Sequence, residues 1–230
     1  MNQDPRNLYL WPGLAKVNSP FVCWNLPFRW RKITAMQRRW LWLFLAIVVL
    51  DLAAFTWWHR RRGEGRYDRW IQQAAGNYGV DPALVKAVIW RESRFDSSAR
   101  GLAGEIGLMQ IRSLAAEEWA QAERLWRFSH QQLIDPEMNI RAGAWYLSKL
   151  LKRYFQADNP LPYALADYNA GRVHVLRWMK GAAKTNSAAF LSRMDFPGTL
   201  SYVRAVTERH AHYRVAFSPS STGRSERRHP

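Results

Sequence analysis

The sequence has almost no cysteine and no recognisable metal or nucleic-acid motif. Cys23 is the only thiol among 230 residues, so no disulfide can form within the chain. Cysteines and histidines at zinc-binding spacing are missing, and so is an RNP-like aromatic pattern. The stretch 67–213 also lacks the apolar–polar alternation of strands. We therefore expect no nucleic-acid partner and no fold supported by disulfides.

Acidic residues are few compared with basic ones. The chain has 18 Asp and Glu against 34 Lys and Arg, a formal net charge of +16. This imbalance indicates an anionic partner, such as a membrane face, an acidic polymer or a nucleic acid. A nucleic-acid-binding protein is the alternative that charge alone supports, and it predicts DNA affinity that falls steeply with salt.

One long apolar run interrupts this basic chain. It reads WLWLFLAIVVLDLAAFTWW at 40–58, and as a helix its last 18 residues cover about 27 Å, close to a hydrocarbon core. Tryptophans stand at both ends, where interfacial aromatic residues belong. No small-x-small cleavage site is evident near Ala53. We expect an uncleaved transmembrane anchor that tolerates Asp51, and a cleaved signal peptide or a buried core helix is the alternative.

The segments around the run are predicted from composition. Residues 1–39 form a short arm, or an extension upstream of a true start at Met36, and 59–66 form a basic linker. Residues 217–230 form a disordered tail. The flanks carry five basic residues each within the ranges 29–39 and 60–69, so the positive-inside rule does not orient the anchor.

Residues 67–216 are expected to form one all-α domain. Three helix starts are marked by a capping residue followed by proline, at Asp81, Asp135 and Asn159. Gly171 ends the third of these helices. Thr199 is expected to cap a last helix that runs to Tyr213.

Glu92 is the first candidate for chemistry. It lies in the predicted helix 82–95 and continues the apolar positions Val85 and Val88 at three- and four-residue steps. A carboxyl at the edge of an apolar face loses hydration, so its pKa should rise, as a general acid near neutral pH requires. The alternative is a glutamate at a helix end that reaches solvent or pairs with Arg91 or Arg94.

Two further stretches favour the functional reading of Glu92. Glycines at 101, 104 and 107 allow tight turns or close approach of a ligand to the backbone. Farther on, Tyr168 continues an inward face, and its hydroxyl needs a partner for which a buried carboxyl is suitable.

Four ordered motifs resemble those of the soluble (Slt) type of lytic transglycosylase. They are ES at 92–93, GLMQ at 107–110, YNAG at 168–171 and YV at 202–203. The resemblance implies a goose-lysozyme-like helical domain, here behind a single N-terminal transmembrane helix. It also implies cleavage of the β-1,4 bond between N-acetylmuramic acid and N-acetylglucosamine in peptidoglycan.

The same resemblance implies the site residues and the location. Glu92 would be the single catalytic residue, and Gln110, Tyr168, Asn169 and Tyr202 would bind the glycan. No metal or organic cofactor is expected. The partners would be peptidoglycan strands and, through 40–58, the lipid bilayer. The domain would face the periplasm from a bacterial inner membrane, with a possible link to cell-envelope machinery.

A second catalytic carboxylate is not evident in the sequence. The candidates are Asp96, Glu105 and Asp167, and none has a position that pairs naturally with Glu92. In lytic transglycosylase chemistry Glu92 would first be the acid and then the base, and the 6-hydroxyl of the muramic unit would close a 1,6-anhydro ring. A hydrolytic muramidase and a non-catalytic peptidoglycan-binding protein of a secretion or conjugation machine remain alternatives.

The chain departs from the family pattern at three places. Arg112-Ser113 follow GLMQI where Met-Pro is common, and Gly101 stands where a small hydroxyl residue is often found. Gly198-Thr199 precede YV in place of the usual Glu-Thr. We expect these changes to affect the preferred substrate and the rate more than the type of reaction.

Overall fold

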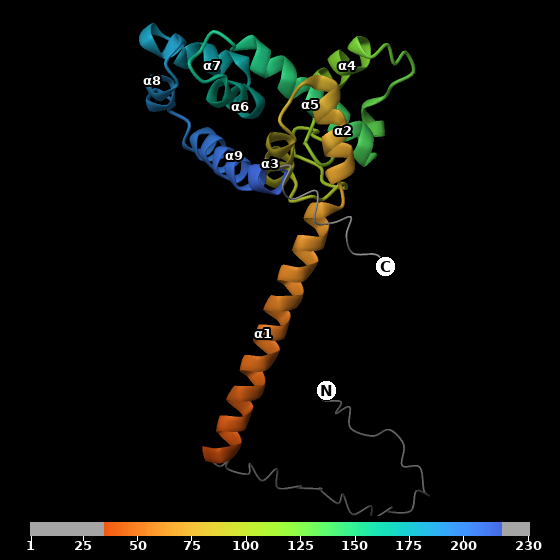
Figure 1. Cartoon of the computed structure of the whole chain (residues 1–230), viewed down its shortest axis with the longest axis vertical. Helices are drawn as coiled ribbons and strands as arrows, with labels where there is room; N and C mark the ends of the chain where they lie inside the picture. Colours follow the sequence, from red (N-terminus) through yellow and green to blue (C-terminus); the bar gives the residue numbers. More distant parts are fainter. Residues whose placement is uncertain (1–34, 218–230) are drawn as a thin grey trace, which may run out of the picture. The chain divides into compact units, whose positions relative to one another are not determined.

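The computed structural model describes residues 35–217, with side chains described for 38–52, 63–215 and 217 (Figure 1). The predicted disordered tail therefore lies outside the described residues except for Phe217, and so does nearly all of the predicted N-terminal arm. The chain divides into two compact units, one up to Leu50 and one from Asp51 onward.

The first described element is α1, a helix that spans Ala35–Gly65. Its apolar side chains are largely exposed, with values of 69% for Trp42 and 67% for Leu50. The predicted linker 59–66 is helical through Gly65. Among the described residues, no helix has the length and apolar character needed to cross a membrane.

From Asp68 onward, every regular element that the structure describes is helical. The only extended pairings are isolated bridges around Ile106. The prediction of an all-α domain is thus confirmed. The elements are α2 (Asp68–Tyr78), α3 (Pro82–Glu92), α4 (Ser113–Ala122), η1 (His130–Ile134), α5 (Pro136–Arg153), α6 (Pro160–Ala170), α7 (Arg172–Trp178), η2 (Gly181–Lys184), α8 (Ser187–Ser192) and α9 (Pro197–Ala216).

The three predicted helix starts are confirmed with their caps. The side chain of Asp81 accepts a hydrogen bond from the N–H of Ala83 at 2.8 Å. Asp135 accepts from Met138 at the start of α5, also at 2.8 Å, and Asn159 caps α6 in the same way. A short polar side chain satisfies an N–H that has no partner within the helix, and proline follows where no N–H is needed.

Two predicted helix ends are wrong. Helix α3 ends at Glu92 and not at Phe95, because Arg94 and Phe95 have φ values of 55° and 67°, which no right-handed helix accommodates. The last helix begins at Pro197, so Thr199 lies inside α9 and is not its cap.

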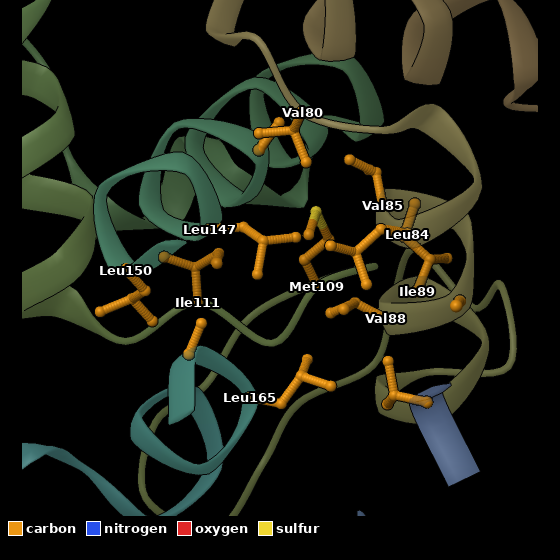
Figure 2. Packing of buried hydrophobic residues seen from close by; sticks show 14 of the residues in the cluster. Val80, Leu84, Val85, Val88, Ile89, Met109, Ile111, Leu147, Leu150 and Leu165 are labelled. Atoms are coloured by element: carbon orange, nitrogen blue, oxygen red, sulfur yellow. The ribbon is translucent and has the colours of Figure 1, made fainter. Parts of the chain in front are cut away.

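Helix α3 lies at the centre of the core. Val85, Val88 and Ile89 are fully buried and face residues of α5 and of the loop that follows α3 (Figure 2). The apolar positions Val85 and Val88 are thus buried as predicted. Burial also extends around the helix, since Lys86 is only 5% exposed and donates to Asp68 at 2.6 Å. A helix covered on all sides holds its last residue, Glu92, in a fixed place.

The loop that carries GLMQ is fastened to α5 by one buried amide. The side chain of Asn139 accepts from the N–H of Met109 at 2.8 Å and donates to the carbonyls of Ile106 and Leu133. Gly107 has φ of +77°, and a Cβ there would lie 2.4 Å from the Asn139 amide nitrogen. The glycine is needed because backbone and amide meet without space for a side chain.

We expect Asn139→Ala to lower the free energy of unfolding by about 2 to 4 kcal/mol, because it leaves buried backbone groups without partners. Chemical denaturation of the full chain measures this. The matched control is Asn77→Ala at an exposed position of α2, where a change within about 0.5 kcal/mol is expected. Equal effects of the two substitutions would contradict the anchoring interpretation.

Candidate active site

A cleft of about 680 Å³ contains Glu92 together with most of the predicted site residues. Its walls come from the end of α3, the glycine-rich loop, the start of α4, the middle of α5 and the segment joining α6 to α7. The charged, amide and aromatic side chains that line it are Glu92, Glu105, Gln110, Arg112, Glu118, Tyr146, Arg153, Asp167, Tyr168, Asn169 and Arg172.

Glu92 stands at the bottom of this cleft as the last residue of α3. Its side chain is half-buried, and the hydroxyl of Tyr202 donates to its Oε1 at 2.6 Å. Burial raises the pKa of Glu92 to about 7. The Tyr202 bond and the charge of Arg91 lower it in part, and the charge of Glu105 adds to the rise. A carboxyl that loses water is more stable in its neutral form, so this group still holds its proton near neutral pH.

Tyr202 lies behind Glu92 rather than in the cleft. It comes from α9, is 1% exposed and does not belong to the lining of the cleft. The role of Tyr202 in glycan binding stays a prediction. Its hydroxyl is bound to Glu92, so the contact that the structure shows is with the acid.

Tyr168 does not bond Glu92, although the sequence analysis offered a buried carboxyl as its partner. Its hydroxyl donates to the carbonyl oxygen of Met109 at 2.7 Å. Its ring lies against that of Tyr146, with centroids 5.6 Å apart. Both rings line the cleft, so they form an aromatic wall that is held by the GLMQ loop.

Gln110 and Asn169 line the cleft, and in each side-chain amide one polar atom is already hydrogen-bonded within the protein. The Nε2 of Gln110 donates to the carbonyls of Gly107 and Ala99 at 2.8 and 3.1 Å, which leaves its oxygen as an acceptor. The Oδ1 of Asn169 accepts from the hydroxyl of Thr199 at 2.9 Å, which leaves its amino group as a donor. Gln110 also has φ of 49°, a strained conformation of the kind found at functional sites.

The other carboxylates considered in the sequence are engaged elsewhere. Asp96 is exposed and bonds Ser98. Asp167 is 2% exposed and accepts from Arg153 and Tyr154 at 2.5 and 2.6 Å. Asp167 lines the cleft, but both of these bonds hold the same oxygen, Oδ2. Neither group is placed as a free partner for Glu92.

Glu105 is the carboxylate that electrostatically affects Glu92. Its Oε1 pairs with Arg112 at 2.7 Å, and its Oε2 accepts from the N–H of Ala103 at 3.0 Å. Partial burial by itself would raise its pKa, but the hydrogen bonds and the charge of Arg112 outweigh burial and lower the pKa. The cleft therefore contains a neutral acid and a fixed carboxylate, whose environments push their pKa values apart.

The sequence analysis missed several cleft residues. Tyr146 and Glu118 belong to α5 and α4 and carry no motif, so only the fold brings them to the site. Arg172 directly follows YNAG, and that adjacency was the available signal. Among the described side chains, no group of three or more His, Cys, Asp and Glu is arranged to hold a metal ion.

Comparison with known proteins identifies relatives of this domain. The family described as Transglycosylase SLT domain matches residues 69–191. The chain is 39% identical over 113 residues to membrane-bound lytic murein transglycosylase F of Desulfosudis oleivorans, covering 48% of this chain and 23% of that protein. It is 31% identical over 179 residues to membrane-bound lytic murein transglycosylase C of Salmonella typhimurium, covering 74% and 49%.

Solved structures agree with this match. An inactive mutant of the lytic transglycosylase Slt from Pseudomonas aeruginosa superposes with a TM-score of 0.60 at 30% identity, over 66% of this chain and 24% of that one. The 70-kDa soluble lytic transglycosylase in complex with bulgecin A gives 0.62 at 26% identity, over 73% and 27%. The chain thus spans about half, or less, of the length of these relatives.

Removing the Tyr202 hydroxyl is expected to raise the pKa of Glu92 above about 7, because the bond stabilises the ionised carboxylate. In Tyr202→Phe the neutral acid should persist to higher pH, and any activity that needs this acid should decline at higher pH than in the unmodified protein. The measurement is an NMR titration of the Glu92 carboxyl carbon.

Tyr163→Phe is the matched control for this titration. The Tyr163 hydroxyl is also buried and bonds the carbonyl of Ala183 at 3.0 Å, away from the cleft, so its loss should leave the Glu92 titration unchanged. An unchanged or lower pKa in Tyr202→Phe would show that the hydroxyl does not stabilise the carboxylate.

Proposed function

Because this chain belongs to the Transglycosylase SLT domain family, we propose that it is a lytic transglycosylase of peptidoglycan. It would cleave the β-1,4 bond between N-acetylmuramic acid and N-acetylglucosamine. The observation that carries the proposal is Glu92, a half-buried acid with a pKa of about 7 at the bottom of the cleft. The names of the relatives, lytic murein transglycosylases, support the same activity.

The first step is protonation of the leaving oxygen by Glu92. A general acid works best when its pKa lies near the working pH, since it then holds a proton and still gives it up. Burial raises the pKa of Glu92 to this range. After Glu92 has given up its proton, the hydrogen bond from Tyr202 stabilises the carboxylate. The aromatic wall of Tyr146 and Tyr168 offers a surface for the sugar, and the amides of Gln110 and Asn169 offer an acceptor and a donor.

The second step uses the same residue as a base. Glu92, now ionised, takes the proton from the 6-hydroxyl of the muramic unit, and this oxygen attacks the anomeric carbon to close the 1,6-anhydro ring. Glu92 is neutral again at the end, so the cycle balances with one carboxyl. Ordinary glycosidases need a second carboxyl about 5 to 9.5 Å from the first, and the other carboxyls that line this cleft are bound by basic side chains.

Glu92→Gln is expected to reduce glycan cleavage by at least about a hundredfold, because the amide can neither donate nor accept the required proton. Purified sacculi are digested with the full chain and with the variant, and the released products are weighed by mass spectrometry. The transglycosylase product is one water lighter than the hydrolysis product. Retained binding of Glu92→Gln to sacculi would show that the variant is folded.

The same digestion separates the alternative functions. Products that carry the added water would identify a hydrolytic muramidase. Equal inactivity of the unmodified chain and Glu92→Gln, with binding intact in both, would identify a non-catalytic peptidoglycan-binding protein.

We further propose that the apolar run 40–58 anchors the protein in the bacterial inner membrane, with the catalytic domain in the periplasm. Helix α1 contains the whole run, and most of its described apolar side chains are exposed. Two relatives are named membrane-bound transglycosylases, which supports association with a membrane. A periplasmic partner in a cell-envelope machine is compatible with this arrangement.

Membrane fractionation and a reporter fused to the C-terminus check the anchor. We expect the full chain in the membrane fraction, resistant to carbonate extraction, and a periplasmic alkaline phosphatase fusion that is active. Replacing Leu45, Val48 and Val49 by serine should release the protein from the membrane, because each change reduces the apolar character that insertion needs. A soluble full chain, or an inactive phosphatase with an active cytoplasmic reporter, would contradict the proposal.

A further inference from the structure

The charges that line the cleft are not balanced. Three of its four carboxyls are held by a basic side chain, in the pairs Glu105–Arg112, Asp167–Arg153 and Glu118–Lys149. The fourth, Glu92, is largely neutral below about pH 7. Arg172 also lines the cleft and is exposed. No ion pair or hydrogen bond holds its guanidinium within the part of the chain that the structure describes. The cleft thus presents an uncompensated positive charge to its substrate.

Arg112 is a second cation of the cleft, and its ion pair with Glu105 uses only some of its N–H donors. Its Nε and Nη2 both lie 2.7 Å from Oε1 of Glu105, and its side chain remains 64% exposed. The backbone N–H of Ala103 donates to Glu105, so the loop backbone helps to hold the Glu105 carboxylate beside Arg112. A guanidinium has five N–H donors, and the pair with Glu105 leaves the others available in the cleft.

Both arginines follow directly on parts of the glycan-binding site. Arg112 comes two residues after Gln110, and Arg172 comes three residues after Asn169 and is the first residue of α7. Each is therefore carried by a segment that also supplies an amide to the cleft. Arg112 is also one of the departures from the motif pattern that the sequence resembles, in which Met-Pro commonly follows GLMQI.

We propose that Arg172, assisted by Arg112, binds a carboxylate carried by the muramic unit of the substrate, on its peptide stem or, where no stem is attached, on its lactyl group. The inference rests on the proposed function, since it names the substrate feature that the same cleft selects. Guanidinium and carboxylate form paired, charge-assisted hydrogen bonds. In a cleft open to water we expect the loss of Arg172 to weaken binding about five- to tenfold.

Binding is measured in the Glu92→Gln background of the full chain, so that the readout does not depend on turnover. The ligands are glycan strands with peptide stems, strands stripped of stems by an amidase, which retain the lactyl carboxylate, and neutral N-acetylglucosamine oligomers. Arg172→Gln is compared with Arg172→Lys, which keeps the charge, and with Arg204→Gln, an exposed arginine of α9 that does not line the cleft. Arg204→Gln should change no affinity.

A five- to tenfold loss in Arg172→Gln that is confined to stem-bearing strands assigns the stem carboxylates. The same loss confined to the stripped strands, in which the lactyl carboxyl is free, assigns the lactyl group. The same loss on both muramic ligands but not on neutral oligomers assigns whichever of the two carboxylates the muramic unit carries. An equal loss on all three ligands, or on none, overturns the proposal. When Arg172 is unchanged, added salt should weaken binding of stem-bearing strands more than binding of neutral oligomers. This comparison tests the role of charge without any substitution at Arg172.

Failure of this inference and failure of the proposed function give different results. If the unmodified chain releases anhydro products but Arg172→Gln binds every ligand normally, only the charge recognition is wrong. If the chain releases no product while Arg172→Gln loses affinity for charged strands, only the activity is wrong.

Discussion

A hydrogen bond of 2.6 Å joins the hydroxyl of Tyr202 to the carboxyl of Glu92, across 110 residues of sequence. It links the end of α3 to α9, and the two helices pack against each other. Without a partner, a glutamate at the end of a helix would be free to turn toward solvent. With it, the carboxyl stays at the bottom of the cleft, where burial raises its pKa to about 7.

The opposite wall of the cleft depends on a second buried polar group, the amide of Asn139. It binds three backbone groups of the loop and of η1, so the loop cannot move independently of α5. The hydroxyl of Tyr168 completes this arrangement from α6 by binding the carbonyl of Met109. Buried hydrogen-bond networks that are fully satisfied rigidify a site. Here they fix the positions of the aromatic wall and of the Gln110 amide relative to Glu92.

Two departures of this chain from its family pattern, Gly101 and Arg112, have a common physical consequence. Arg112 pairs with Glu105, and a Cβ at Gly101 would lie 2.2 Å from Oε2 of Glu105. The absence of a side chain at position 101 therefore makes room for the carboxylate. Glycine, glutamate and arginine form one unit, which adds a fixed charge pair to the cleft, and the charge of Glu105 contributes to the raised pKa of Glu92.

Features that act over a few residues could be predicted from the sequence alone: the capped helix starts at Asp81, Asp135 and Asn159, and the all-α class that these helices build. A cap bonds an N–H only two or three positions away, so its signal is contained in the local sequence. Two features became evident only in the folded chain: Tyr202 rather than Tyr168 bonds the acid, and Lys86 is buried against Asp68. Those outcomes depend on which distant helices come into contact, and a hydroxyl or an ammonium group bonds whichever partner the packing places within about 3 Å.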